Sequence, residues 1–345
     1  MDLFGRDFIC TQDWTVEELV ETLELAAKMK RERFSPRWTR VLEHQTFIMF
    51  FYNPSVRTRI SFEAAATELG GHAQFMTPSA GRFKTEKKAG ETIEDAATVM
   101  ARYAAGLGIR ILEDKVPYYG AGDEVLQEYA RWANVPILNM ADDRFHPCQA
   151  LADVMGWAEW MGHGPARPDY EALRGKKFLL SWGSGALARS WCSVQAALLI
   201  ASRFGMDVTM AYPEGYDLDP EVIEWTTQNC RENDASFDVV HDPDSGYEDA
   251  HVVYSRNWVS PEAYQDGELQ KQAEIEKAMA YQGWTTTAER MARTDNAIFT
   301  HPMPVDRGNE VIDEVASGPR SAIYDIAENR LHVQKAVMAL TMGNW

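Results

Sequence analysis

Two hydroxyl groups and two guanidinium groups fall within five consecutive positions, at Ser55, Arg57, Thr58 and Arg59. They stand between the apolar run Thr46–Tyr52 and a helical segment that stops at Gly70. A helix N-terminus offers unpaired backbone N–H groups and the positive end of the helix dipole. The spacing therefore predicts a phosphate-binding turn without the lysine of a P-loop. Ordinary helix capping by Ser55, with both arginines in solvent, is the alternative.

A histidine, His146, stands where a second apolar run, Val135–Met140, gives way to a helix. The proline that follows it suits the first helical position. In α/β sheets, ligands bind at the carboxyl ends of strands. His146 could there donate to a carbonyl oxygen that gains negative charge during acyl transfer, and Gln149, one turn further on, could reach the same pocket. A histidine that only caps the helix is the alternative.

Three more polar groups follow apolar runs. Arg110 is a charge within the strand-like run Gly108–Leu112, and a buried guanidinium needs an anion, either a ligand or a salt bridge. His301 follows the run Ala297–Thr300, and Arg330 lies near the start of the last predicted helix.

The elements that must position these groups alternate between apolar runs and segments of helical period. This alternation predicts an α/β fold of parallel strands joined by crossover helices. The expected strands are 46–52, 108–112, 135–140, 178–182, 208–212, 251–254 and 297–300, and helices are expected over 91–105, 186–204 and 268–280. The polar stretch Trp258–Thr294 is either a flap over the site or a solvated insertion.

Length and composition restrict the class of protein. A chain of 345 residues exceeds one typical core, so two domains are expected, with the junction between His146 and the loop-like stretch Met161–Asp169. A formal net charge of -18 argues against a nucleic-acid or anionic-membrane partner. The four scattered cysteines have no zinc-ligand spacing and suggest free thiols. With no membrane-length apolar run and no signal-peptide pattern, a cytoplasmic protein is expected.

Four motifs together resemble the aspartate and ornithine carbamoyltransferase family. They are Ser-x-Arg-Thr-Arg, His-Pro-Cys-Gln-x-Leu-Ala-Asp, His-x-x-Pro and Ala-Glu-Asn-Arg-Leu-His-Val-Gln-Lys, in the family's order from residue 50 to the C-terminus. Within the family the chain is most similar to the N-acetylornithine and N-succinylornithine carbamoyltransferases. The resemblance implies a transferase of one-carbon groups in amino-acid metabolism, specifically in arginine biosynthesis.

The resemblance also implies the architecture. Two doubly wound parallel-sheet domains are expected, 1–148 for carbamoyl phosphate and 149–327 for the acceptor, with the C-terminal helix 328–345 completing the first. It leaves open whether the chain past residue 176 forms a shallow knot.

The resemblance implies no cofactor and no metal, with carbamoyl phosphate as co-substrate. Its phosphate would be held by Ser55, the backbone of Val56, Arg57 and Thr58, and its carbamoyl end by Arg110, His146, Gln149 and Arg330. Of these, Arg57, Arg110 and His146 are the expected catalytic residues. Val56 replaces the threonine of ornithine and aspartate enzymes, which removes a hydroxyl contact and keeps the N–H group.

For the acceptor, the decisive departure from ornithine enzymes is Arg256. It replaces the aspartate that holds the α-ammonium, and the acetylornithine branch has a lysine there. A cation at this place favours an anionic acceptor with a blocked α-amine. The other expected acceptor contacts are Asn139, Trp258, His301, Met303 and Pro304. Ornithine and aspartate stay open as alternative acceptors, because His301–Pro304 departs toward the aspartate enzymes.

The family also implies a homotrimer with shared active sites. Lys84, in the basic stretch Arg82–Lys88, would reach the phosphate of a neighbouring subunit, unless this stretch is only a solvated run of charge. Two alternatives from other classes remain. Gly183 and Gly185 fit the Gly-x-Gly-x-x-Ala turn of a nicotinamide-dependent oxidoreductase, and a family member could bind carbamoyl phosphate without catalysis.

Overall fold

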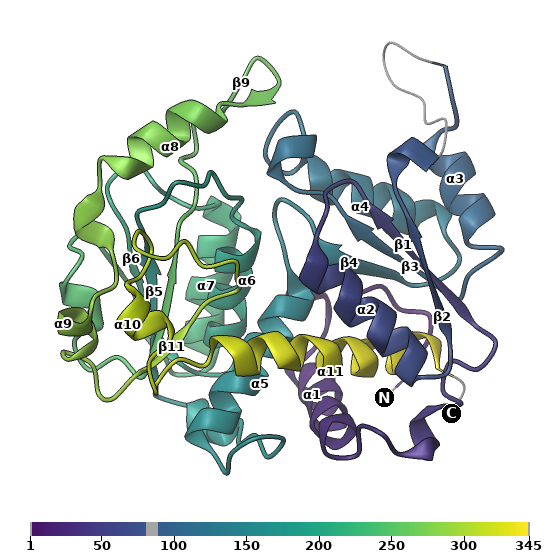
Figure 1. The fold of residues 1–345 in the computed structure, drawn as a ribbon, viewed down its shortest axis with the longest axis horizontal. Coiled ribbons are helices and arrows are strands. Elements are labelled where there is room, and N and C mark those ends of the chain that lie inside the picture. Colours follow the sequence, from purple (N-terminus) through teal and green to yellow (C-terminus); the bar gives the residue numbers. More distant parts are fainter. Residues whose placement is uncertain (1, 81–88, 344–345) are drawn as a thin grey trace. The chain divides into compact units, whose positions relative to one another are not determined.

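The computed structural model describes residues 2–80 and 89–343 of the chain. The chain forms two compact units, Met1–Cys148 with Arg330–Trp345, and Gln149–Asn329. The divisions fall inside helices α5 (Pro147–Met161) and α11 (Ile323–Met342), which therefore each contribute to both units (Figure 1). The sequence placed these divisions after residues 148 and 327.

The sheet of the first unit is entirely parallel. Its strands follow the order β2 (His72–Met76), β1 (Thr46–Phe51), β3 (Gly106–Arg110) and β4 (Ile137–Ala141). The helices of this unit are α1 (Val16–Arg31), α2 (Val56–Glu68), α3 (Ile93–Met100), α4 (Ala121–Trp132) and the last part of α11. Because parallel strands end at one edge, the loops after β1, β3 and β4 leave the sheet on the same side.

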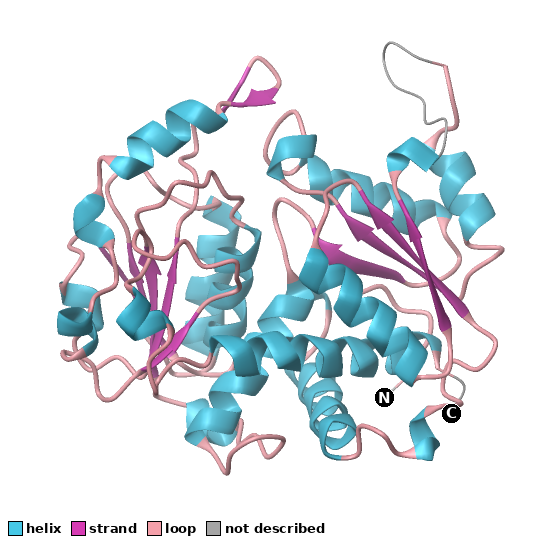
Figure 2. Ribbon diagram, viewed as in Figure 1, coloured by secondary structure: helices cyan, strands magenta, loops and turns pink. Residues whose placement is uncertain are grey.

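The second unit also has a parallel sheet. Its strands follow the order β11 (Ile298–Thr300), β8 (Val252–Arg256), β5 (Lys177–Trp182), β6 (Asp207–Ala211) and β7 (Phe237–Val240). Its further helices are α6 (Cys192–Arg203), α7 (Pro220–Glu232), α8 (Lys271–Met279), α9 (Ala288–Met291) and α10 (Asp313–Ala316). In both units the helices pack around the central sheet (Figure 2). The predicted α/β class with two parallel-sheet domains is confirmed.

Short elements complete the chain. A small hairpin joins β9 (Tyr264–Gln265) to β10 (Glu268–Leu269). Single turns of 3₁₀ helix occur at Thr11–Asp13, Pro36–Trp38, Pro78–Ala80, Glu113–Lys115, Glu171–Leu173, Ser245–Tyr247 and Gln282–Trp284.

All the predicted strands exist, with ends shifted by at most two residues. The sequence missed β2 and β7, both at the edges of their sheets, because their residues are half-buried or exposed and give no apolar run. The helix predicted from Ala186 was wrong at its start, since α6 begins only at Cys192. The preceding residues are used in other contacts, such as the Ala186 N–H donated to Asp306 Oδ2 at 2.7 Å.

The segment between β8 and β11 is fixed to the second unit rather than loosely solvated. Ser260 donates to the Glu274 carboxylate of α8 through its N–H at 2.7 Å and its hydroxyl at 2.8 Å. The Trp182 ring, at the end of β5, meets the rings of Tyr281 and Trp284 edge-on, with centroids 5.9 and 6.4 Å away. This segment therefore packs against the carboxyl end of β5.

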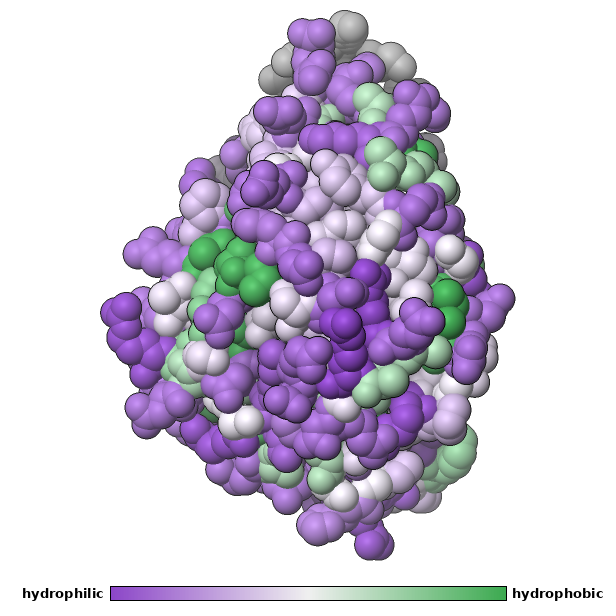
Figure 3. All heavy atoms as spheres, turned by 90° about the vertical axis from the view of Figure 1, so that its left-hand side faces the viewer, coloured by the Kyte–Doolittle hydropathy of each residue, from purple (hydrophilic) through white to green (hydrophobic). Residues whose placement is uncertain are grey.

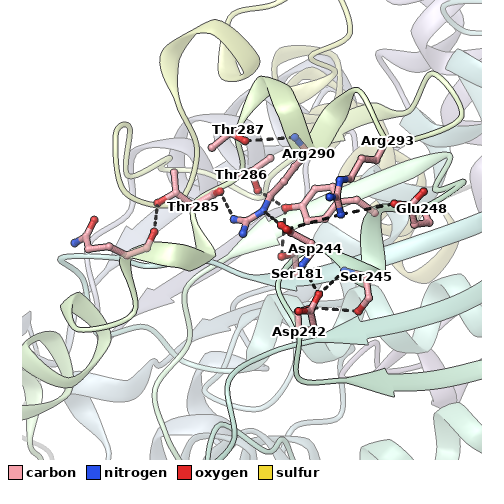
Figure 4. A network of polar contacts seen from close by, with 12 residues as sticks. Ser181, Asp242, Asp244, Ser245, Glu248, Thr285, Thr286, Thr287, Arg290 and Arg293 are labelled. Carbon is pink, nitrogen blue, oxygen red and sulfur yellow. Dashed lines mark hydrogen bonds and ion pairs between the residues drawn. The ribbon is translucent and has the colours of Figure 1, made fainter.

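A polar network anchors the far end of the same segment (Figure 4). Arg290, in α9, donates from Nε to Asp244 at 2.8 Å and from Nη1 to the Thr285 carbonyl oxygen at 2.6 Å. Arg293 lies 3.8 Å from Asp244 and 3.6 Å from Glu248. These ion pairs tie the segment to the loop between β7 and β8.

The side of the molecule drawn in Figure 3 is mostly hydrophilic, with apolar residues in small separate patches. This agrees with the formal net charge of -18. In the described ranges, no helix has the length and apolar character needed to cross a membrane.

Candidate active site

The first predicted turn has the geometry of an anion site. Ser55 is the N-cap of α2, and its Oγ accepts from the Thr58 N–H at 3.3 Å. The remaining N–H groups of the first helical turn can bind an anion. Arg57 is half-buried within this turn, whereas Val56 is 73% exposed and so is no part of the core.

Arg330 joins this turn from the other end of the sequence. It lies on α11 in the part of that helix that belongs to the first unit, and it is only 5% exposed. Its Nη2 donates to Thr58 Oγ1 at 3.4 Å. A residue from the last helix thus adds a guanidinium to the start of α2.

Arg110 and His146 lie at the ends of the neighbouring strands. Arg110 closes β3, in register with Phe51 of β1 and Ala141 of β4, and its Nη1 donates to the Met140 carbonyl oxygen at 3.5 Å. His146 follows β4 directly before α5 and is 7% exposed. The sheet therefore places the β1, β3 and β4 loops, with Arg57, Arg110 and His146, at one edge.

Asn53, which was not predicted from the sequence, also lies at this edge of the sheet. Its Oδ1 accepts from the Leu112 N–H at 2.7 Å, and its Nδ2 donates to the Asp114 carboxylate. It thereby fixes the loop after β1 to the loop after β3. The Asn-Pro pair at 53–54 is a known turn signal, and it could have predicted a turn at Asn53.

Two other predicted carbamoyl phosphate ligands are not in the described part of the first unit. Gln149 belongs to the second unit, where it is buried and donates from Nε2 to Asp153 at 2.8 Å. Lys84 lies outside the described residues.

In the second unit, Arg256 is the last residue of β8 and is 7% exposed. Its Nε and Nη1 are buried and have no hydrogen-bond partner among the described residues. A buried guanidinium is costly unless hydrogen bonds and an opposite charge compensate it. This geometry suits a ligand with an anionic or carbonyl oxygen.

Glu310 organises the loops around Arg256. Its buried carboxylate accepts from the Asn257 N–H at 2.8 Å and from the Asp306 N–H at 2.7 Å, and lies 3.9 Å from Arg189 Nε. Glu310 could not be predicted from the sequence, because its partners come from distant loops.

His301 also contacts Glu310. His301 Nδ1 accepts from the Met303 N–H at 2.8 Å, so the ring proton is on Nε2, which donates to Glu310 at 3.0 Å. Burial lowers the pKa of His301, and the histidine is therefore neutral at pH 7.

The remaining predicted acceptor residues have varied placements. Trp258 is fully buried and donates from Nε1 to the Tyr216 carbonyl oxygen at 2.9 Å. Pro304 is exposed, its carbonyl oxygen accepts from Arg189 Nη2 at 2.9 Å, and Met303 beside it is half-buried. Asn139 is fully buried in the first unit, and its amide donates to protein groups. Its Oδ1 has no hydrogen-bond partner among the described residues, and the acceptor contact by Asn139 stays a prediction.

Comparison with known proteins identifies the family. The model of the aspartate/ornithine carbamoyltransferase carbamoyl-P binding domain matches residues 6–159, and the model of the Asp/Orn binding domain matches residues 187–341. The chain belongs to the aspartate/ornithine carbamoyltransferase family. It is thus an enzyme, a carbamoyltransferase, as the sequence predicted.

Relatives of two kinds within the carbamoyltransferase family are similar over their full lengths. The ornithine carbamoyltransferase of Thermococcus kodakarensis is 37% identical, over 99% of this chain and 98% of the relative. The N-acetylornithine carbamoyltransferase of Xanthomonas campestris pv. campestris is 36% identical, over 98% of each. These identities do not separate the two acceptors.

Solved carbamoyltransferase structures have the same fold. An acetylornithine transcarbamylase complexed with acetylcitrulline superposes with a TM-score of 0.89 at 35% identity, covering 98% of this chain and all of that one. An N-acetyl-L-ornithine transcarbamylase mutant complexed with carbamyl phosphate and N-succinyl-L-norvaline gives a TM-score of 0.87 at 35% identity, over 97% and 99% of the two chains.

The glycines that suggested an oxidoreductase have a packing role in this carbamoyltransferase. A Cβ at Gly183 would meet Glu310 at 3.2 Å, and one at Gly185 would meet Asn257 at 3.0 Å. The helix after them begins seven residues beyond Gly185, not at the turn as dinucleotide binding requires. In the described part of the chain, no group of three or more His, Cys, Asp or Glu side chains has the arrangement of a metal site.

The charge environment of Glu310 predicts how this carbamoyltransferase responds to acid. Burial alone would raise the pKa of Glu310, but His301 and the guanidiniums of Arg189 and Arg256 lower it to about 2, from 4.5. Since the folded pKa is depressed, the carboxylate stabilises the fold above about pH 4.5, and this contribution is lost as the pH falls toward 2. We expect Glu310→Gln to lower the free energy of unfolding at pH 7 by on the order of 3 kcal/mol.

Urea denaturation of both proteins at pH 7, 4 and 3 measures this effect. The difference between wild type and Glu310→Gln should shrink as the pH falls. A difference that is constant across this range would show that the Glu310 carboxylate does not titrate as described.

Proposed function

We propose that this enzyme transfers the carbamoyl group of carbamoyl phosphate to the side-chain amine of an N-acylated, ornithine-like acceptor and releases phosphate. The observation that carries the acceptor assignment is Arg256, a buried guanidinium whose Nε and Nη1 lack partners among the described residues. A carboxylate or acyl oxygen of the acceptor would supply the missing charge-assisted hydrogen bonds.

The charge balance around Arg256 supports an anionic acceptor. Arg189 and Arg256 contribute two buried positive charges, Glu310 one negative charge, and His301 is neutral. The nearby Asp306 carboxylate accepts from the Ala186 N–H and from the Asn309 amide. The buried groups therefore carry one more positive than negative charge, whereas Asp306 is only half-buried. The buried Arg256 guanidinium would repel the α-ammonium of free ornithine, and acylation of that amine removes the repulsion.

The first unit supplies the proposed groups for carbamoyl phosphate, except Gln149, which belongs to the second unit. Ser55, the Val56 N–H, Arg57 and Thr58 would bind the phosphate at the start of α2, where backbone N–H groups and the helix dipole favour anions. Arg330, which already donates to Thr58, would face the same substrate. Arg110 and His146 would bind the carbonyl oxygen, and Gln149 is proposed as a further ligand of the carbamoyl end.

The reaction needs positioning and charge more than a nucleophilic side chain, because carbamoyl phosphate is a reactive mixed anhydride. The neutral amine forms a C–N bond to the carbonyl carbon, and Arg110 and His146 stabilise the resulting oxyanion. The C–O bond to phosphate then breaks, and Arg57 stabilises the leaving group. The phosphate takes the proton that the amine loses.

We further propose that the enzyme is a cytoplasmic homotrimer, with Lys84 of one subunit completing the site of another. Support comes from apolar side chains on α2 beside the phosphate turn. Val56 is 73% exposed and Ile60 is 60% exposed, one helical turn apart. Exposed apolar neighbours of this kind are typical of subunit contacts.

Acceptor-dependent release of inorganic phosphate from carbamoyl phosphate tests the proposed function. N-acetylornithine or N-succinylornithine should stimulate release, and ornithine and aspartate should not. Stimulation by ornithine alone would instead support the activity for which the Thermococcus kodakarensis relative is named. No stimulation by any of these amines would contradict the proposed acceptor class.

A further inference from the structure

The loop that carries His146 is closed by a buried carboxylate, that of Asp142. Its Oδ1 accepts from the Arg144 N–H at 2.7 Å and, through a very short contact, from the Phe145 N–H. The Asp142 N–H in turn donates to the Phe145 carbonyl oxygen at 3.1 Å. These bonds fix both peptide groups of Phe145, the residue directly before His146.

The amide of Asn139 holds the Asp142 carboxylate from the strand. Its Nδ2 donates to Asp142 Oδ2 at 2.7 Å, to the Ile9 carbonyl oxygen at 2.8 Å and to the Phe145 carbonyl oxygen at 3.4 Å. Both side chains are fully buried. The loop is therefore tied to the body of β4 through a polar pair.

The backbone between these two residues is strained. Ala141 has a φ of 151°, which residues with a side chain rarely adopt. It faces Arg110 across the sheet at a shift in strand register, and its carbonyl oxygen accepts from the Ile111 N–H at 3.0 Å. Bulges of this kind re-aim side chains near active sites. The strain thus lies between the strand that ends in Arg110 and the loop that ends in His146.

Burying the Asp142 carboxylate here is unfavourable. Burial raises its pKa well above the usual value, and the neighbouring carboxylates of Asp123 and Asp143 raise it further. A turn alone would not require a fully buried acid, because serine or asparagine also closes turns of this type.

We propose that Asp142 is a positioning residue for His146, holding its imidazole against the carbonyl oxygen of carbamoyl phosphate. This inference rests on the proposed role of His146 in carbamoyl transfer. Asp142 is fully buried, and it would act through the peptide groups of Phe145. Asn139, whose amide donates to the Asp142 carboxylate, would support the same positioning.

A double-mutant cycle tests the proposal. Asp142→Ala should lower kcat by about 100-fold, the usual effect of a small misplacement of a reacting group. If Asp142 acts only through His146, the Asp142→Ala/His146→Ala protein should be about as slow as His146→Ala alone. The KM for the acceptor should stay within about twofold. If the fold-losses of kcat in the two single variants instead multiplied in the double variant, the proposal would be overturned.

The adjacent Asp143 provides a matched control. It is equally buried, but its carboxylate accepts from the N–H groups of Gly120 and Gly122 at the start of α4. The effect of Asp143→Asn should multiply with that of His146→Ala. Non-additivity there as well would show a general loosening of the fold and would overturn the proposal.

The isosteric Asp142→Asn protein guards against a variant that does not fold. Its amide oxygen can still accept the two backbone N–H bonds, but its NH2 group would face the NH2 group of Asn139. An intermediate loss of kcat is therefore expected. The kcat is calculated for the folded fraction, which thermal unfolding measures. If the two single variants, Asp142→Asn and His146→Ala, both kept the wild-type kcat, this inference and the role of His146 would be overturned. If His146→Ala had a low kcat and the losses of the two single variants multiplied in the double variant, only this inference would be overturned.

Discussion

Replacing Arg57 with alanine is expected to lower kcat with carbamoyl phosphate by about 1,000-fold, while the protein stays folded. The guanidinium lies in the first turn of α2, where it would neutralise charge as the phosphate leaves. Fixed charges aimed at charge that develops in the transition state are worth about 100- to 1,000-fold each. Steady-state kinetics with saturating acceptor measures the loss.

Arg59, two residues further along the same helix, is the matched control. It is exposed, donates to Glu63 at 2.9 Å and lies over the Phe75 ring with its Cζ 3.9 Å from the centroid. Its partners are protein groups, so Arg59→Ala should change kcat less than about threefold, as for most surface substitutions. Equal losses in the two variants would remove Arg57 from the phosphate site.

Replacing Arg256 with methionine should separate the two substrates. We expect kcat/KM for N-acetylornithine to fall by about 100-fold, because a charged hydrogen bond to a buried group contributes roughly 1.5–3 kcal/mol. The KM for carbamoyl phosphate should change little, since its proposed ligands, apart from Gln149, lie in the first unit. The discrimination against ornithine should fall as well, since the substitution removes positive charge.

Arg307→Met serves as the control for Arg256. Arg307 is an exposed arginine of the same unit that donates to Asp313 at 2.7 Å and to Ser317 at 2.9 Å. Its loss should leave both kinetic constants within about twofold. Parallel losses for the two substrates in Arg256→Met would place Arg256 outside the acceptor site.

The sequence predicted the fold where structure depends on local pattern. Apolar runs such as Phe178–Trp182 gave the central strands, because strands buried on both faces need uninterrupted apolar residues. The edge strand β7 was not predicted, because its residues are partly exposed and need not be apolar. The start of α6 was misplaced because tertiary contacts of Ala186 override its helical preference.

The candidate site divides in the same way. Ser55 and Arg57 could be predicted because a strand, a turn and a helix start occur together in one short segment. Asn53, Asp142 and Glu310 act through partners brought together only by the fold, such as Leu112 for Asn53. Their residue types alone suggest turns or solvent, and their importance appears only with their burial and hydrogen bonds.

A competition assay between ornithine and N-acetylornithine identifies the acceptor of this carbamoyltransferase. Carbamoyl phosphate, ornithine and N-acetylornithine, with both amines at equal concentration, are incubated with the enzyme, and both carbamoylated products are quantified by mass spectrometry. The product ratio gives the ratio of kcat/KM values. Because of the positive charge of Arg256, we expect carbamoylated N-acetylornithine in at least about 100-fold excess over citrulline. Citrulline as the main product would contradict it.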